Sequence, residues 1–337
     1  MKKNWMKVAA IYIGTVIGAG FASGREIMDF FGVYGSRGLW GIYISGILFS
    51  IVGGLLLLKI YKNKIKDFDS LVEGVFNKKV SILIDIITSI SLYTGFSIMI
   101  SASGAIFKEQ FGLPFNLGIA VMLICSFLVF LYSLKGLSFI NSLLVPILII
   151  GILFITINIS SKGPLKLMDI SGENISKKGN FISSAILYFG SNCLIIIIVF
   201  SSLLPIIEDK KTAILGGAVG GIILYILGIS ILYSMLMYYE EIANLDIPML
   251  RISSYVSVGY GKVYGVILWI SMFTTALANG YGFINKYSKG RNKALISTIL
   301  CMSSIPLAQL GFSNLVGIIY PIFGFIGSIM MILLLIK

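Results

Sequence analysis

The sequence predicts an all-α membrane protein with ten transmembrane helices, and three observations support this fold class. Hydrophobic residues make up 57% of the 337 positions and charged residues only 12%, against roughly 25% charged in soluble proteins. The mean hydropathy is +0.98. Apolar runs, each long enough for the roughly 20 residues that cross a bilayer, follow one another with short polar connections. This composition excludes a soluble enzyme, a disordered chain and a disulfide scaffold.

Charges and turn residues bound the apolar runs. In chain order they cover residues 5–31, 38–60, 80–107, 115–134, 137–160, 180–207, 212–238, 260–286, 292–311 and 313–336. The longest polar connections lie at 62–79 and 161–179, and residues 239–259 are expected to form a short interfacial helix or hairpin. The chain is then a single integral membrane domain whose five-helix halves are residues 1–160 and 161–337.

The distribution of basic residues predicts the orientation. With the N-terminus inside, 17 of the 26 Lys and Arg residues face the cytoplasm, so the positive-inside rule places both termini in the cytoplasm of a multi-pass cell-membrane protein. The net charge of +12 is then explained by lysines that face anionic lipid, and no nucleic-acid partner is expected. The N-terminal run is expected to remain as the first span rather than to be cleaved as a signal peptide.

Several chemistries are excluded by residue counts. The chain has no histidine, which excludes histidine zinc sites, haem ligation and Ser-His-Asp relays. Its three cysteines (Cys125, Cys193 and Cys301) are far apart in apolar runs, as is typical of buried thiols. We therefore expect no enzyme activity and no cofactor other than a coupling ion.

The first span carries four glycines within the stretch GTVIGAGFASGREI. Gly18, Gly20 and Gly24 imitate a dinucleotide-binding fingerprint, but the spacing is one residue too long and the βαβ unit is missing. Two interpretations remain. Gly14 and Gly18 can serve close helix packing, or the glycines can let the helix unwind at the bilayer midplane and free amides and carbonyls for a ligand.

A second interruption favours the broken helix. The sixth span contains Gly190-Ser191-Asn192-Cys193, a polar stretch inside an apolar run, and paired interruptions in the two halves indicate a transporter binding site. The anionic group of a substrate would meet backbone amides of the first break, and its amine would meet carbonyls of the second. We therefore predict a substrate site formed by Gly18, Ala19, Gly20, Phe21, Tyr93, Phe189, Gly190, Ser191 and Asn192. Tyr188 is expected to flank the same cavity.

The run Ile17-Gly18-Ala19-Gly20-Phe21 resembles the span-one break of the amino acid–polyamine–organocation (APC) superfamily. The longer stretch GTVIGAGFASGREI is most similar to its YkvI-type branch of bacterial membrane proteins. The resemblance implies a LeuT-like fold, with a 5+5 inverted repeat and broken helices 1 and 6. It also implies secondary active transport of an amino acid or related small organic solute by alternating access. The family's usual acidic residue after the span-six glycine is replaced here by Asn192 and Cys193.

The resemblance further implies a sodium site. Sodium-coupled members use a carbonyl and two hydroxyls at i, i+3 and i+4 on span eight, a spacing that Ser271, Thr274 and Thr275 share. The carbonyls of Gly14 and Ile17 would complete five oxygen ligands for Na⁺ as the coupling ion of a symporter. The alternative is that the two threonines bond to their own helix. Proton coupling and facilitated transport also remain open.

Charged residues within spans are candidate gates because they are costly in a membrane. Arg25 and Glu26 lie in the outer half of span one. If Arg25 forms an outer gate, its partner is Glu240, Glu241 or a neighbour on its own helix; otherwise this face is solvated. Asp85, about six residues into span three, is expected in an inner gate or in a vestibule near the lysines that precede it, or it carries a proton.

The partners expected are a small-molecule substrate and the lipid bilayer. The main alternative function is a solute-sensing receptor that keeps the transporter fold, like a germinant receptor, and binds without net transport. A channel is disfavoured because no charged ring or repeated filter occurs. Metal transport is disfavoured because the spans lack a cluster of acidic and His or Met ligands.

Overall fold

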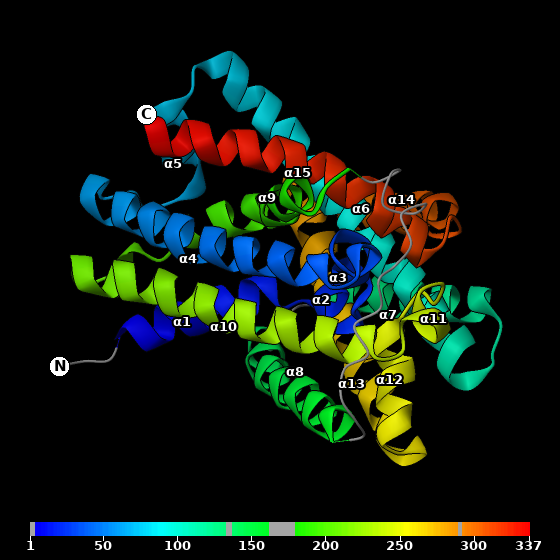
Figure 1. Cartoon of the computed structure of the whole chain (residues 1–337). Coiled ribbons are helices and arrows are strands. Elements are labelled where there is room, and N and C mark those ends of the chain that lie inside the picture. Colours follow the sequence, from blue (N-terminus) through cyan, green and yellow to red (C-terminus); the bar gives the residue numbers. More distant parts are fainter. Residues whose placement is uncertain (1–3, 133–136, 162–178, 289–291) are drawn as a thin grey trace.

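The computed structural model describes residues 4–132, 137–161, 179–288 and 292–337, and every regular element among them is helical (Figure 1). The predicted connection at 161–179 lies almost wholly outside the described residues. The elements are α1 (Asn4–Val16), α2 (Ala19–Ser23), α3 (Arg25–Phe30), η1 (Gly32–Tyr34), α4 (Arg37–Asn63), α5 (Phe68–Val75), α6 (Lys78–Phe111), α7 (Phe115–Tyr132), α8 (Leu137–Ser160), α9 (Phe181–Ser201), η2 (Leu204–Ile206), α10 (Lys210–Leu236), α11 (Tyr239–Ile242), α12 (Pro248–Val256), α13 (Val258–Tyr287), α14 (Lys293–Ala308) and α15 (Phe312–Ile336).

The predicted all-helical class is confirmed. Among the described residues, seven helices are long and apolar enough to cross a membrane, namely α4, α6, α8, α9, α10, α13 and α15. Helices α7 and α14 are apolar but shorter, and α1 to α3 occupy the first predicted span. The count of ten spans and the 5+5 repeat therefore remain predictions. Residues 239–256 contain the short helices α11 and α12, while the interfacial position of this segment remains a prediction.

Two sets of helices pack against each other. Helices α4 and α10 lie side by side along most of their length, with α1 and α9 against them (Figure 1). Helix α6 packs against α7, α13 and α14, while α15 lies on α9 and α6, and α8 touches α10 and α13. Helix α2 contacts α13, which packs with α6, whereas α1 packs against α10 and α9.

Glycines allow the close approach of α4, α10 and α1. A Cβ on Gly217 would lie 2.3 Å from the backbone nitrogen of Gly54, and one on Gly220 would lie 2.4 Å from the ring of Tyr12. The Tyr12 hydroxyl donates a hydrogen bond to the carbonyl of Phe49 at 2.9 Å. Small residues bring helices close enough for dispersion contacts, which drive helix association inside a membrane.

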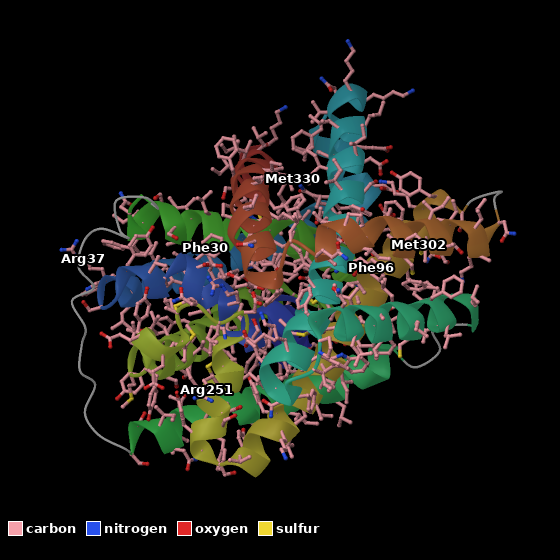
Figure 2. The ribbon with its side chains drawn as sticks, turned by 90° about the vertical axis from the view of Figure 1, so that its right-hand side faces the viewer. Phe30, Arg37, Phe96, Arg251, Met302 and Met330 are labelled. Atoms are coloured by element: carbon pink, nitrogen blue, oxygen red, sulfur yellow. The ribbon has the colours of Figure 1, made fainter. Side chains whose placement is uncertain are left out.

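The outer faces of the helices are apolar. Figure 2 shows Phe96 within the bundle and Met302 on the outside of α14, where it is 63% exposed. Other large apolar side chains exposed in the same way are Trp40, Ile150, Ile157, Ile318 and Phe325. An apolar exterior of this extent would be insoluble in water and is typical of a surface that contacts lipid. The chain is thus a multi-pass membrane protein.

Candidate functional site

The first span is broken where the glycine motif predicts. Helix α1 ends at Val16 and α2 begins at Ala19, while Gly18 takes an extended backbone conformation with φ −101° and ψ −175°. A Cβ on Gly18 would meet no atom within 4 Å, so open space adjoins the break. The helix interruption predicted for span one is confirmed.

The break leaves both backbone amides and backbone carbonyls without hydrogen-bond partners. Within the described stretch around it, the amides of Ala19, Gly20 and Phe21 donate to no carbonyl and no side-chain cap. The carbonyls of Gly14 and Ile17 accept no backbone hydrogen bond there. Unsatisfied backbone at membrane depth is tolerated only where it lines a cavity or meets a ligand, so this segment is the core of the candidate site.

A second turn redirects the chain six residues later. Gly24 has φ +79°, a left-handed conformation that favours glycine. A Cβ there would lie 2.7 Å from Cγ of Met249, so α12 packs directly on the turn. The turn separates α2 from α3, and the side chains of Arg25 and Glu26 consequently reach different neighbours.

Arg25 is a buried clamp rather than a solvated residue. Its guanidinium pairs with Asp29 through two bonds, Nη2 to Oδ1 at 2.7 Å and Nε to Oδ2 at 3.0 Å. Its Nη1 donates to the carbonyls of Ala243 at 3.1 Å and Leu245 at 2.9 Å. Arg25 is 8% exposed, so the alternative that this side of α3 faces solvent is wrong. The partner of Arg25 is its helix neighbour Asp29 rather than Glu240 or Glu241.

Residues 243–247, which join α11 to α12, are held by two further helices, and we call this segment the clasp. The Glu109 carboxylate at the end of α6 accepts from the amides of Asp246 at 2.7 Å and Ile247 at 3.1 Å. The Asp246 carboxylate accepts from the amide of Ser313 in α15 at 2.9 Å. The clasp therefore ties α3, α6 and α15 together over one end of the molecule. Glu109 and Asp246 are site residues that sequence reasoning missed.

The Glu26 carboxyl turns back towards the break. Glu26 is 6% exposed, and a Cβ built on Gly20 would lie 1.9 Å from its Oε1, which shows how closely the carboxyl fills the space beside this glycine. The hydroxyl of Tyr320 in α15 is hydrogen-bonded to the same carboxyl. Tyr320 carries no motif in the sequence, so only the tertiary structure connects it to the break.

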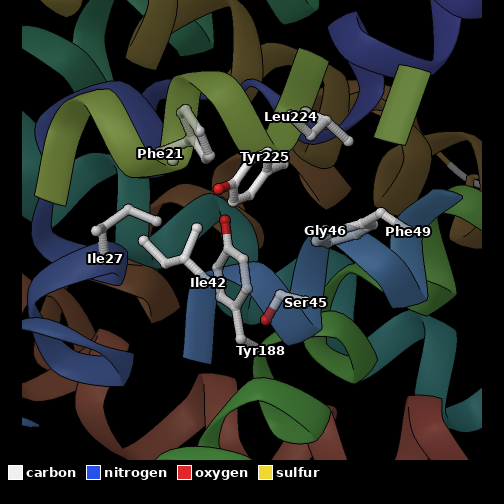
Figure 3. A pocket seen from close by; sticks show the side chains of 10 residues that line it. Phe21, Ile27, Ile42, Ser45, Gly46, Phe49, Tyr188, Leu224 and Tyr225 are labelled. Atoms are coloured by element: carbon white, nitrogen blue, oxygen red, sulfur yellow. The ribbon is translucent and has the colours of Figure 1, made fainter. Parts of the chain in front are cut away.

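A small cavity lies between α2, α3, α4, α9 and α10 (Figure 3). The hydroxyl of Tyr188 points into it and, among the described residues, has no hydrogen-bond partner. Tyr188 is also an electrostatic neighbour of Glu26. The side chains that line the cavity are Phe21, Ile27, Ile42, Ser45, Phe49, Tyr188, Leu224 and Tyr225. Of the residues predicted for the substrate site or beside it, Phe21 and Tyr188 line this cavity.

The break predicted in the sixth span is absent. Helix α9 runs without interruption from Phe181 to Ser201. The side chains of Ser191 and Asn192 donate to the carbonyl of Tyr188 at 2.8 and 3.0 Å, within their own helix. The carbonyls proposed to meet an amine therefore lie within a regular helix, and the expectation of a broken helix 6 is wrong for this structure.

Packing against α15 explains the glycine in α9. A Cβ on Gly190 would lie 2.0 Å from the carbonyl oxygen of Gly324, and one on Gly327 would lie 2.1 Å from the carbonyl oxygen of Gly190. The two helices cross with their backbones nearly in contact, which only glycine permits. Gly190 thus serves helix packing, the alternative use of a membrane glycine.

Two of the predicted sodium ligands bond within their own helix, α13. The hydroxyls of Thr274 and Thr275 donate to the carbonyl of Ser271 at 3.0 and 2.9 Å, as membrane threonines often do. Both hydroxyl oxygens keep lone pairs for a cation, and the free carbonyls of Gly14 and Ile17 are suitable hard ligands. Helix α13 packs against α2, which begins directly after the break. The sodium site stays a prediction.

The two aromatic residues proposed for the substrate site lie apart from each other. The Tyr93 hydroxyl donates to the carbonyl of Ser303 in α14 at 2.7 Å, and its ring packs on Phe283. The Phe189 ring is buried against Phe49 at a centroid distance of 5.1 Å. Both side chains have structural neighbours here, and their roles in binding remain predictions.

Asp85 pairs with a lysine that is distant in sequence. The Lys286 ammonium on α13 lies 2.6 Å from Oδ1 of Asp85 on α6 and donates to the Asp85 carbonyl at 2.6 Å. The partner is thus Lys286, not the preceding lysines at 78 and 79. The pair links α6 and α13 at the end of the molecule away from the clasp, a position suited to a second gate.

The Asp85→Asn variant should fold with nearly unchanged stability. The Asp85 side chain is 66% exposed, and exposed ion pairs contribute roughly 0–1 kcal/mol. Thermal midpoints of the purified variant and wild type, compared at low and high salt, check this. A loss of several kcal/mol would show instead that the pair is a structural contact of the resting fold.

Comparison with known proteins gives relatives of similar length and a shared fold. No family model matches the chain. It is 26% identical to the Bacillus subtilis (strain 168) membrane protein YkvI over 333 residues, which cover 96% of this chain and 93% of YkvI. It is 25% identical to YyaD of the same organism, covering 98% and 96%. The first similarity agrees with the YkvI-type resemblance of the first span, while membership of the wider superfamily stays a prediction.

Solved transporter structures share the fold. The inward-facing conformation of Mhp1 has a TM-score of 0.70 at 14% identity and covers 95% of this chain and 72% of Mhp1. Mhp1, a nucleobase-cation-symport-1 family transporter, gives 0.61 in a closed conformation, at 14% identity and coverages of 92% and 73%. A variant of the Eremococcus coleocola manganese transporter gives 0.64 at 12% identity, with coverages of 98% and 79%. These neighbours are transporters and not enzymes. The chain therefore has the LeuT-like fold of membrane transporters, with its first transmembrane segment broken at Gly18.

Proposed function

We propose that the protein is a secondary active transporter that moves a small organic solute by alternating access about the break between α1 and α2. The observation that carries the proposal is the set of unpartnered amides and carbonyls at this break, beside the open space at Gly18. Such groups are costly at membrane depth unless they meet a ligand. The transporter fold supports the same function.

The clasp corresponds to one closed gate. Arg25 and Glu109 hold residues 243–247 over one end, while the opposite end is joined at Asp85 and Lys286, where the carboxylate is mostly exposed. If the N-terminus is cytoplasmic, as the positive-inside rule predicts, the closed end faces outward. The higher TM-score against the inward-facing form of Mhp1 supports this assignment.

An amino acid or a related small solute is the proposed substrate. Its carboxylate would meet the free amides of Ala19, Gly20 and Phe21, because an amide-lined helix start favours an anion. The amine cannot meet backbone carbonyls of α9, since these lie within a continuous helix. Sodium, if used, would join α1 to α13 through the Thr274 and Thr275 hydroxyls in the state with the clasp open.

A ligand screen tests the proposal directly. The purified protein is heated with amino acids and amines, in sodium and in potassium buffer, and the thermal midpoint is recorded. A ligand at 100 times its Kd stabilises the folded state by about 2.7 kcal/mol. A ligand that needs sodium supports the α13 site. A ligand that binds without accumulating in proteoliposomes would indicate a receptor.

Variants at the break complete the test. The Gly20→Leu variant should lose at least about tenfold of the uptake of a ligand found in the screen, because its Cβ would take the space of the Glu26 carboxyl. Gly259→Leu is the matched control, since its Cβ would meet no atom within 4 Å. The pair Thr274→Ala and Thr275→Ala should abolish any sodium dependence. Unchanged uptake in every variant would dismiss the assigned sites.

A further inference from the structure

Glu26 is a buried carboxyl for which the structure provides no cation. Neither ion pair of the described residues includes it. The guanidinium of its chain neighbour Arg25 is fully used by Asp29 and by the carbonyls of Ala243 and Leu245. Glu26 therefore directly follows Arg25 in the sequence but does not form an ion pair with it.

The elements packed around α3 add only neutral hydroxyls. Helix α9 contributes Tyr188 and α15 contributes Tyr320, and neither helix has a charged side chain except at a distant terminus. The charged residues of the other neighbouring helices are exposed or lie at a distant helix end. The side chains of Arg251 in α12 and of Glu240 and Glu241 in α11 are exposed, and the lysines of α10 lie at the far end of that helix. Two further tyrosines have other neighbours. Tyr239 is near Arg25 and Asp29, and Tyr34 is near Ser184.

An ionised carboxylate in such surroundings loses its hydration and gains no counter-charge, which is costly at membrane depth. A proton removes the charge, whereas a larger cation needs space. That space is absent beside Gly20, because Oε1 of Glu26 already lies 1.9 Å from where a Cβ would be. The Tyr320 contact fills a further side of the carboxyl.

We propose that Glu26 is a proton-binding site, and that it holds a proton while the clasp is closed. The proton is taken from water as an O–H bond forms on the carboxylate, and it returns to water when that bond breaks. Helix α3 carries both Arg25 of the clasp and Glu26, so opening the clasp would move Glu26 into water and release the proton. The inference rests on the alternating-access function proposed above and adds the proton as a coupling ion.

The test follows clasp closure against pH and needs no substrate. Spin labels are placed at the exposed positions Asn244 in the clasp and Asn116 at the start of α7, in a background where the three native cysteines are alanine. Pulsed electron spin resonance in lipid nanodiscs then gives the closed and open populations between pH 5.5 and 8.5. One linked proton changes their ratio by up to tenfold per pH unit.

The closed population of wild type should fall at least about tenfold relative to the open one as the pH rises. Glu26→Gln should stay closed at every pH, while Glu73→Gln, an exposed glutamate of α5, should keep the wild-type response. A wild-type ratio that is constant with pH overturns the proposal, as does a pH response retained by Glu26→Gln. If the glutamine variant fails to fold, the wild-type series still decides.

The same data separate this proposal from the proposed function. A protein that transports nothing could still show the pH response of the clasp, and a transporter without this response would leave the substrate site at the break intact.

Discussion

The Gly190→Leu variant should yield little or no folded protein. Even the first added atom, Cβ, would lie 2.0 Å from the carbonyl oxygen of Gly324 and 2.2 Å from the hydroxyl of Ser328. These two atoms belong to backbone and to a side chain, so α9 and α15 would have to separate along their crossing. Overpacking by single methylenes costs about 1–3 kcal/mol, and a leucine adds four carbons against a total stability of roughly 5–15 kcal/mol.

Size-exclusion chromatography of a fluorescent fusion and the thermal midpoint of the purified protein measure this loss. Gly190→Ala should be damaged as well, though less, because it adds the clashing carbon alone. Gly259→Leu in α13 is the matched helical control, whose Cβ would meet no atom within 4 Å. A monodisperse Gly190→Leu protein with the wild-type midpoint would show that the α9–α15 crossing is looser than the structure has it.

Removal of Arg25 should open the clasp and destabilise the fold. In Arg25→Ala the buried Asp29 keeps its charge without the guanidinium, and breaking one side of a buried pair costs about 3–5 kcal/mol. The carbonyls of Ala243 and Leu245 lose their donor at the same time. Arg25→Lys should rescue this only in part, because an ammonium cannot reproduce the bidentate contact.

The expected readouts are a lower thermal midpoint and faster hydrogen exchange in residues 243–247. Combining Arg25→Ala with Asp29→Ala should recover part of the midpoint, since the buried charge is gone, but not the protection of the clasp. Arg251→Ala is the control. Its exposed guanidinium lies 5.4 Å from the centroid of the Tyr255 ring, and its loss should change stability by at most about 1 kcal/mol. Exchange that is equally slow in wild type and Arg25→Ala would mean that Arg25 does not hold the clasp.

Features that depend on neighbours in sequence could be predicted. Apolar runs bounded by charges correspond to the helices, because a spanning helix satisfies its own backbone. The break at Gly18 follows from glycines with little preference for a helix within one segment. The sequence allows several partners for Arg25, although an i, i+4 spacing already favours Asp29.

Features that depend on contacts between segments distant in sequence could not be predicted. Gly18 and Gly190 look alike in sequence, yet one stands at a break and the other at a helix crossing, because only the second is met by the backbone of α15. In the same way Asp85 faces Lys286 rather than the lysines before it.

The amino-acid sequence is enough to predict that this chain is a helical membrane protein, where its helices lie and that its first span is interrupted. These properties arise from composition and local backbone preference. Only the packing of distant segments keeps α9 continuous, closes α11–α12 over Arg25 and buries Glu26 between tyrosines, with no cation paired to it among the described residues. The reason is that each of these depends on which surfaces of remote helices meet, and in a membrane that choice is made by close packing of small residues and by buried hydrogen bonds.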